Sequence, residues 1–277
     1  MDRAEFYSLP VFAKQKVQVP VLMLSPYRIA LFRHCKLQYK FHCVDKLAKQ
    51  YGRPRPYYTT ANHVHATLYD LLSVVSPWER TVETAVTLLE KKWRRYRLGF
   101  RNKADEKRWA QRALAEVTRF VRGHDVPITP VMLEKPIEAE ITPGLLLRGR
   151  VDRVDRGPDG SFHVIDCKTG NRPEEIDWTQ IQLHALILSR NSLHTVSKTS
   201  YSYLLSGATG TMEFDETTSA KVSWELFLTA KEIRGERDYA PNPGNGCAGC
   251  VTLRSFALPS VTTMSICLRQ AFLYGGT

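Results

Sequence analysis

The chain has 277 residues, of which 43% are hydrophobic and 24% charged, a composition typical of globular proteins. This length can bury a sizeable core, as one large domain or two modest ones. No apolar run reaches the roughly 18 residues of a membrane-spanning helix, and the N-terminal stretch lacks the apolar core of a signal peptide. We therefore exclude membrane-embedded and secreted classes and expect a cytoplasmic protein.

The charge indicates the kind of partner. Lys and Arg number 39 against 28 Asp and Glu, which gives a formal net charge of +11. This charge favours a polyanion such as nucleic acid, ahead of an anionic membrane surface. The alternative is a basic surface kept for solubility. We adopt nucleic acid and expect no membrane partner.

The N-terminal part predicts an irregular arm followed by a helix. Residues 1–21 show little periodicity. Ser25 before Pro26 is typical of a helix start, because serine caps the first turn and proline fits its first position. Cys35 lies at helical spacing from two apolar residues, so we expect it on the apolar face.

A second helix is expected from about residue 61 to 74, with one apolar stripe. His65 lies beside that stripe, and His63 lies two residues earlier. The sequence alone does not fix which of the two rings points inward. Taken by itself, the segment favours a histidine that serves only the core or the surface.

Residues 78–125 form a charged segment with helical periodicity. From Lys91 to Arg122 it holds twelve Lys or Arg and three acids, with aromatic residues between them. Such a surface could follow a phosphate backbone and stack bases, whereas a solvated helix face is the alternative. The candidate DNA-binding residues are Lys91, Lys92, Arg94, Arg95, Arg97 and Arg101.

Three strands come next, over residues 131–141, 145–156 and 161–168, as an antiparallel meander. A Gly-Pro-Asp-Gly turn at 157–160 joins the last two as a hairpin.

The hairpin brings acids and a lysine together. Asp166 and Lys168 are two residues apart and therefore project from the same side of their strand. On the partner strand either Asp152 or Asp155 would lie near Asp166. Two carboxylates and an ammonium suit a hard divalent cation and a polarised water, while a solvated surface pair is the alternative.

The next helix, from about residue 177 to 189, has Asp177 as a plausible N-cap. Gln180 and His184 lie one turn apart on it and form a candidate polar pair for the site. Gln182 is a less favoured candidate for the position of Gln180 in that pair. An exposed polar pair on a core helix is the other interpretation.

Strands at 199–205 and 212–214 and a helix at 219–234 complete the pattern. The predicted fold class is α/β: a small mixed sheet flanked by helices, with a helical subdomain inserted near 78–125.

Cys247 and Cys250 form a C-x-x-C in a Pro/Gly-rich loop. Alone, this pattern fits a zinc knuckle, a redox pair or neither. The six cysteines of a protein in a reducing compartment do not predict a disulfide framework. Residues 251–277 hold two arginines, no acid and no clear periodicity, so we treat them as an atypical tail.

In this order, the elements resemble the PD-(D/E)XK nuclease superfamily, and within it the RecB-like exonuclease branch. That branch includes the CRISPR-associated adaptation exonucleases and the nuclease domains of RecB and AddAB. The resemblance rests on the G-x-x-D that ends at Asp152, the I-D-x-K-T-G strand and Gln180, and it covers about residues 22–250. It implies a restriction-endonuclease-like fold and a metal-dependent DNA nuclease.

The resemblance also implies roles for single residues. The implied catalytic residues are Asp152, Asp166, Lys168 and Gln180. The implied ligands of Mg²⁺ or Mn²⁺ are His65, Asp152, Asp166 and the backbone carbonyl of Cys167. Glu134, in an L-E-K-P context, is a supporting acid, and His184 stands where the family's Q-x-x-x-Y motif has tyrosine.

The branch also binds a 4Fe–4S cluster through an N-terminal cysteine and three C-terminal ones. Cys35, Cys247 and Cys250 match that arrangement, but Phe256 stands where the third C-terminal cysteine belongs. Either Cys267 completes a four-cysteine site, or the cluster is absent or labile.

The function that the resemblance implies is a DNA exonuclease preferring single strands, used in repair, recombination or CRISPR spacer processing. The sequence has no P-loop motif, so a helicase or a CRISPR adaptation partner would supply any unwinding. A catalytically silent DNA-binding subunit is the main alternative, and a restriction-type endonuclease is a weaker one.

Overall fold

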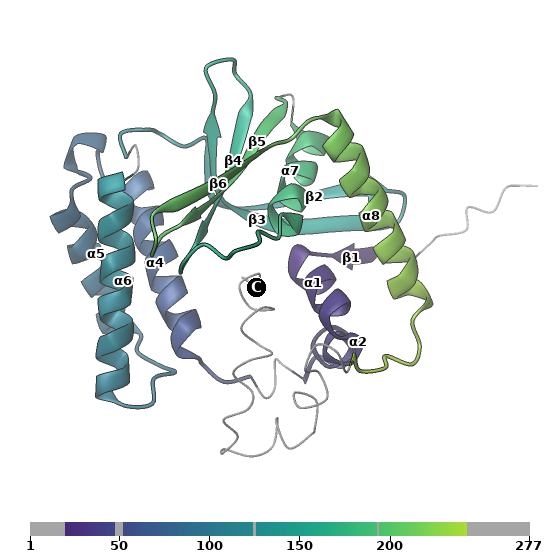
Figure 1. Cartoon of the computed structure of the whole chain (residues 1–277), viewed down its shortest axis with the longest axis horizontal. Coiled ribbons are helices and arrows are strands. Elements are labelled where there is room, and N and C mark those ends of the chain that lie inside the picture. The colour runs from purple at the N-terminus through teal and green to yellow at the C-terminus, as the bar shows by residue number, and fades with distance from the viewer. Residues whose placement is uncertain (1–19, 48–51, 124–125, 193, 243–277) are drawn as a thin grey trace, which may run out of the picture.

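The strand β3 (Leu145–Arg156) organises the sheet of this protein, because it pairs with three other strands in the computed structural model (Figure 1). The structure describes residues 20–47, 52–123, 126–192 and 194–242. Along one edge β3 pairs with the antiparallel β2 (Met132–Thr142). Along the other it pairs first with β1 (Leu22–Leu24), in parallel, and then with β4 (Phe162–Lys168), antiparallel.

The sheet continues with β5 (Val196–Tyr203), parallel to β4, and β6 (Ala208–Glu213), antiparallel to β5. The longer helices are α1 (Pro26–His34), α4 (Pro56–Ser73), α5 (Val82–Arg95), α6 (Lys103–Gly123), α7 (Thr179–Asn191) and α8 (Glu216–Gly235). Short helical turns are α2 (Lys36–Tyr39), the π-helical η1 (Lys40–Val44) and the 3₁₀ turn η2 (Pro77–Glu79). The architecture is therefore the expected mixed sheet flanked by helices.

Two apolar cores lie against this sheet. The larger core packs residues of β1 to β5, and Phe214 just beyond β6, with α1, α7 and α8. The smaller one joins α4, α5 and α6 to Cys167 and Leu204, which lie at or just beyond the ends of β4 and β5. Figure 1 shows these three helices together beside the sheet, away from α1 and α8. The second core therefore fixes α4 and α6 against the strand end that carries the predicted site.

The predicted elements are present, with different ends. The helix with His65 begins at Pro56, because proline fits the first helical position, and it is longer than expected. The helix predicted from Asp177 begins two residues later, since Asp177 accepts the backbone N–H of Thr179 in a turn before the helix. Strand β1 was not predicted, because three apolar residues alone do not distinguish a strand from an irregular segment.

The last helix begins at Glu216 instead of about residue 219, since the side chain of Asp215 caps it by accepting the N–H of Thr218. None of the helices in the described ranges is long and apolar enough to cross a membrane.

Candidate active site

The register of the hairpin places Asp152 and Asp166 on one face of the sheet. Paired residues continue as far as Arg153–Ile165, so Asp152 and Asp166 are the next two positions facing each other. Oδ2 of Asp152 accepts a hydrogen bond of 2.8 Å from the backbone N–H of Cys167. The end of the strand pair thus holds two carboxylates side by side.

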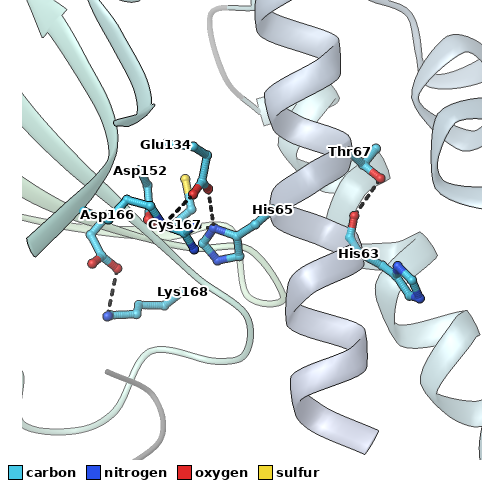
Figure 2. Close-up of polar contacts among 9 residues, drawn as sticks. His63, His65, Thr67, Glu134, Asp152, Asp166, Cys167 and Lys168 are labelled. Carbon is cyan, nitrogen blue, oxygen red and sulfur yellow. Dashed lines mark hydrogen bonds and ion pairs between the residues drawn. The ribbon is translucent and has the colours of Figure 1, made fainter. Parts of the chain in front are cut away.

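Glu134 and His65 join Asp152 from two other elements (Figure 2). The β2 register places Glu134 beside Asp152, and its backbone has a φ of 45°, which is uncommon for a residue with a Cβ. His65 reaches over from α4, with Nδ1 3.0 Å from Oε1 of Glu134 and 3.7 Å from Oδ2 of Asp152. Arg150 holds the other Glu134 oxygen at 3.2 Å.

These three side chains fit a divalent cation. One ligand atom each from His65, Glu134 and Asp152 lies within 4.8 Å of the others. The side chains are 24%, 17% and 16% exposed, so the cluster is shielded yet reachable. Carboxylate oxygens and an imidazole nitrogen form a donor set that suits Mn²⁺, and Mg²⁺ with added water.

The electrostatics of the cluster favour added positive charge. Burial raises the pKa of Asp152 to about 7, and repulsion by Asp166 contributes to the rise. Burial lowers the pKa of His65, but the carboxylates of Asp152 and Glu134 outweigh it and raise that pKa to about 9. The crowded carboxylates therefore stabilise a positive charge bound between them, which a metal ion would supply.

Lys168 and Gln180 lie on the other side of Asp166. Nζ of Lys168 is 2.8 Å from Oδ1 of Asp166, donates to Oε1 of Gln180 at 2.5 Å, and lies 4.9 Å from the centre of the Tyr201 ring. The sequence-predicted set of Asp152, Asp166, Lys168 and Gln180 is thus brought together.

Two predicted metal-site residues have a different environment from the rest. Asp166 contacts Lys168 and lies outside the cluster of His65, Glu134 and Asp152, so Glu134 takes a more central place than the sequence indicated. The thiol of Cys167 is buried in the smaller core, and burial raises its pKa well above the usual value. This thiol therefore stays protonated and serves packing, which leaves the backbone of Cys167 for the site.

His184 is buried beneath Gly149 on β3. It is 3% exposed, and burial lowers the pKa of its ring to about 4, so the ring is neutral. A Cβ at position 149 would lie 2.6 Å from Cδ2 and 2.8 Å from Nε2 of His184. The glycine of the G-x-x-D pattern is required here because α7 packs this ring directly on the strand.

We expect Gly149→Ala to lower the free energy of unfolding by about 1–3 kcal/mol, because the added methyl overpacks a buried contact. Urea unfolding followed by circular dichroism measures the change. Gly123→Ala is the matched control, since nothing lies within 4 Å of a Cβ at that position. Equal stability of the two variants would contradict the contact between Gly149 and His184.

The contacts decide three choices that the sequence left open, namely His63 or His65, Asp152 or Asp155, and Gln180 or Gln182. His63 bonds the backbone carbonyl of Tyr96 at 2.8 Å, on the α5 side of its helix and away from the cluster. Both oxygens of Asp155 accept from the Arg153 guanidinium at 2.7 Å. Gln182 donates to the sulfur of a methionine on β6. His65 and Asp152 are thus the positions in the cluster, and Gln180 is the one beside Lys168.

The basic run of α5 and the following loop is partly neutralised. Lys92 pairs with Asp70 at 2.5 Å, Arg94 with Glu90 at 3.4 Å, and Arg97 approaches Glu106 at 3.8 Å. The remaining candidates, Lys91, Arg95 and Arg101, are exposed. A role for these residues in DNA binding stays a prediction.

The iron–sulfur prediction is only partly within the described residues. Cys35 is fully buried at the end of α1, as expected. Cys247, Cys250 and Cys267 lie outside the described residues. The cluster stays a prediction, which iron analysis and the visible spectrum of anaerobically purified protein can test.

Sequence reasoning missed Arg150, which holds Glu134. The signal was present, because Arg150 and Asp152 are two apart on one strand and therefore share a face. An exposed strand arginine is common, so the pattern alone did not single it out.

Comparisons with known proteins agree with this fold. A solved structure from Eubacterium rectale, described as a "putative exonuclease", has the same fold with a TM-score of 0.50. The two chains share 11% identity over 87% of this chain and 90% of that one. No curated protein matches the sequence. Residues 23–254 match the PD-(D/E)XK nuclease superfamily, and the chain belongs to that superfamily.

Proposed function

We propose that this protein is a metal-dependent DNA nuclease of the RecB-like branch, acting as an exonuclease that prefers single strands. The observation that carries the proposal is the convergence of His65, Glu134 and Asp152 within 4.8 Å, next to Asp166 and its lysine. A net charge of +11 supports a nucleic-acid substrate.

The residues that would hold Mg²⁺ or Mn²⁺ are Asp152, Glu134 and His65, with Asp166 and the carbonyl of Cys167 beside them. When bound, the cation supplies Lewis-acid activation of the phosphate and a nucleophilic water at neutral pH. Arg150 and the backbone N–H of Cys167 hold Glu134 and Asp152 in place, so the ligands are oriented before the cation arrives.

Lys168 would orient the attacking water and offset the negative charge that develops on the phosphate. Asp166, Gln180 and the Tyr201 ring restrain its ammonium from three sides. The water oxygen forms a bond to phosphorus and gives up one proton to solvent, the bond to the leaving sugar oxygen breaks, and that oxygen takes up a proton from solvent. Direct attack by water inverts the configuration at phosphorus.

A catalytically silent DNA-binding subunit is the second candidate function. The intact set of Asp152, Asp166, Lys168 and Gln180 favours the enzyme, because each member contacts another member or the backbone beside it. A role in repair, recombination or CRISPR adaptation, with a helicase or adaptation partner, belongs to the same proposal.

We expect Gln180→Ala to lower cleavage about 10- to 100-fold, because Lys168 loses a partner that orients it. Gln182→Ala, two residues along the same helix, is the control and should leave the rate near that of the wild type. Single-turnover rates on a labelled oligonucleotide measure both. The assignment of Gln180 would be wrong if Gln182→Ala were the slower variant.

Strand preference and polarity are tested together on one gel. Oligonucleotides labelled at either end, single-stranded or in a duplex, are incubated with the protein and Mn²⁺. Progressive shortening of the single strand from one end supports an exonuclease with that polarity. Internal fragments from both labels would instead identify an endonuclease, and binding without any cleavage would favour the silent subunit.

A further inference from the structure

Helix α6 brings an arginine to the loop that follows the catalytic strand. Ala113 and Val117 of α6 lie in the smaller core with Cys167 of β4 and Leu204. Arg112, one position before Ala113, reaches Gly170 just beyond β4, and Glu116 pairs with Arg112. Neither residue has a role in the site described so far.

Glu116 is a buried carboxylate in this helix. Its residue is 0% exposed, Oε1 accepts from Nε of Arg112 at 3.1 Å, and Oε2 has no hydrogen-bond partner among the described residues. Burying a carboxylate is costly unless it is paired, so this residue is not explained by packing alone. Its evident effect is to fix the direction of the Arg112 side chain.

The guanidinium of Arg112 reaches Gly170, two residues after Lys168. Nη2 lies 3.2 Å from the position of a Cβ at Gly170, a residue whose φ of 133° favours glycine. The carbonyl of Gly170 accepts the N–H of Leu205 at 3.0 Å, which fixes the loop. The Arg112 side chain is 37% exposed, so part of it is accessible from solvent.

Trp109 completes the arrangement from one turn earlier in α6. Its ring lies 5.4 Å from the centre of the Arg112 guanidinium and is half-buried. Glu116 uses the Nε–H of a planar group that carries five N–H donors, which leaves the paired donors of its outer edge for an oxyanion. A guanidinium held this way matches the geometry of a phosphate, and an aromatic ring that is only partly buried can stack a base.

We propose that Arg112 binds a backbone phosphate of the substrate strand next to the catalytic lysine, with Glu116 as its positioning residue and Trp109 as a stacking face for a neighbouring base. The proposal rests on the proposed nuclease function and identifies a contact that would position the DNA strand at the candidate active site. It adds a strand contact on α6 to the run at 91–101, whose role in DNA binding stays a prediction.

Equilibrium binding to a labelled oligodeoxythymidylate in EDTA tests the proposal with the full-length chain and without cleavage. Arg112→Gln should weaken binding about tenfold, as expected for loss of a charge-assisted contact. The slope of log K against log salt should fall by about 0.7, the value for one phosphate contact on a single strand. Arg112→Lys should restore that slope.

Arg108→Gln is the matched control, because Arg108 lies on the same helix with a side chain 75% exposed and paired with Asp105. It should change affinity about twofold or less. Glu116→Leu removes a negative charge, so charge attraction alone predicts tighter DNA binding. We expect weaker binding instead, because Arg112 loses the residue that positions it.

The proposal is overturned if Arg112→Gln binds like Arg108→Gln, or if Glu116→Leu binds more tightly than the wild type. A structural role for Arg112 would also overturn it. In that case Arg112→Gln and Arg112→Lys would lower the melting temperature equally, and the folded protein would keep the wild-type slope of log K against log salt. Failure of the nuclease proposal looks different: the wild type would cut no DNA in any metal, whatever Arg112 variants do to binding.

Discussion

Asp152→Asn is expected to abolish metal-dependent cleavage, whereas Asp155→Asn is expected to retain it. Asp152 belongs to the cluster with His65 and Glu134, while Asp155 is held by Arg153 on the other face of the strand. Loss of an outer-shell partner costs a metal site about 10- to 100-fold, so loss of a ligand should exceed that. Cleavage rates in Mn²⁺ for the two variants measure the difference.

The two substitutions should affect folding stability in the opposite order to their effect on cleavage. In EDTA, Asp152→Asn should unfold at the same denaturant concentration as the wild type or a higher one, because crowding with Glu134 and Asp166 is relieved. Asp155→Asn should lose about 1–3 kcal/mol, since it weakens a buried charge-assisted pair. If Asp155→Asn were the inactive variant, the placement of the metal site would be wrong.

Metal binding adds a second difference between these variants. Mn²⁺ at one hundred times its dissociation constant, a ratio chosen for the assay, should stabilise the wild type by about 2.7 kcal/mol. Asp152→Asn should lose this increment, and Asp155→Asn should keep it.

Lys168→Gln is expected to lower the cleavage rate about 10²- to 10⁴-fold, the range for loss of a group that takes part in proton transfer or charge stabilisation. The Lys168 ammonium lies between Asp166 and Gln180 and is not part of the ligand cluster. The variant should therefore bind Mn²⁺ about as well as the wild type, which isothermal titration calorimetry measures.

The matched control for Lys168 is Lys135, which lies on β2 and is exposed. Lys135→Gln removes the same charge elsewhere and should cleave at nearly the wild-type rate. A Lys168→Gln enzyme with full activity, or one that had lost Mn²⁺ binding, would contradict the role given to this lysine.

The sequence predicted the sheet and the strand with Asp166 and Lys168 because these depend on local patterns. Alternation placed Asp166 and Lys168 on one face, and the turn at 157–160 indicated the hairpin. Alternation could not choose between Asp152 and Asp155, since a one-residue change in the turn shifts the register and exchanges the two faces. The observed register, with Arg153 opposite Ile165, places Asp152 beside Asp166.

The remaining site residues depend on packing between distant elements. His65 reaches the cluster because α4 docks on the strand ends through the smaller core, and no local pattern in α4 encodes that docking. Glu134 points inward with a φ of 45°, a backbone conformation that its L-E-K-P context does not reveal. Glu116 was hidden for a similar reason, because a glutamate within a charged helix predicts an exposed residue and not a buried one.

We propose that the hairpin of β3 and β4 is the centre of a metal-dependent nuclease, and the other predictions depend on this. The most direct test compares wild type and Asp166→Ala on end-labelled single-stranded DNA with Mn²⁺, Mg²⁺ or EDTA. We expect cleavage by the wild type with either metal, none in EDTA, and none by Asp166→Ala, which should remain folded. Undiminished cleavage by Asp166→Ala, or by the wild type in EDTA, would contradict it.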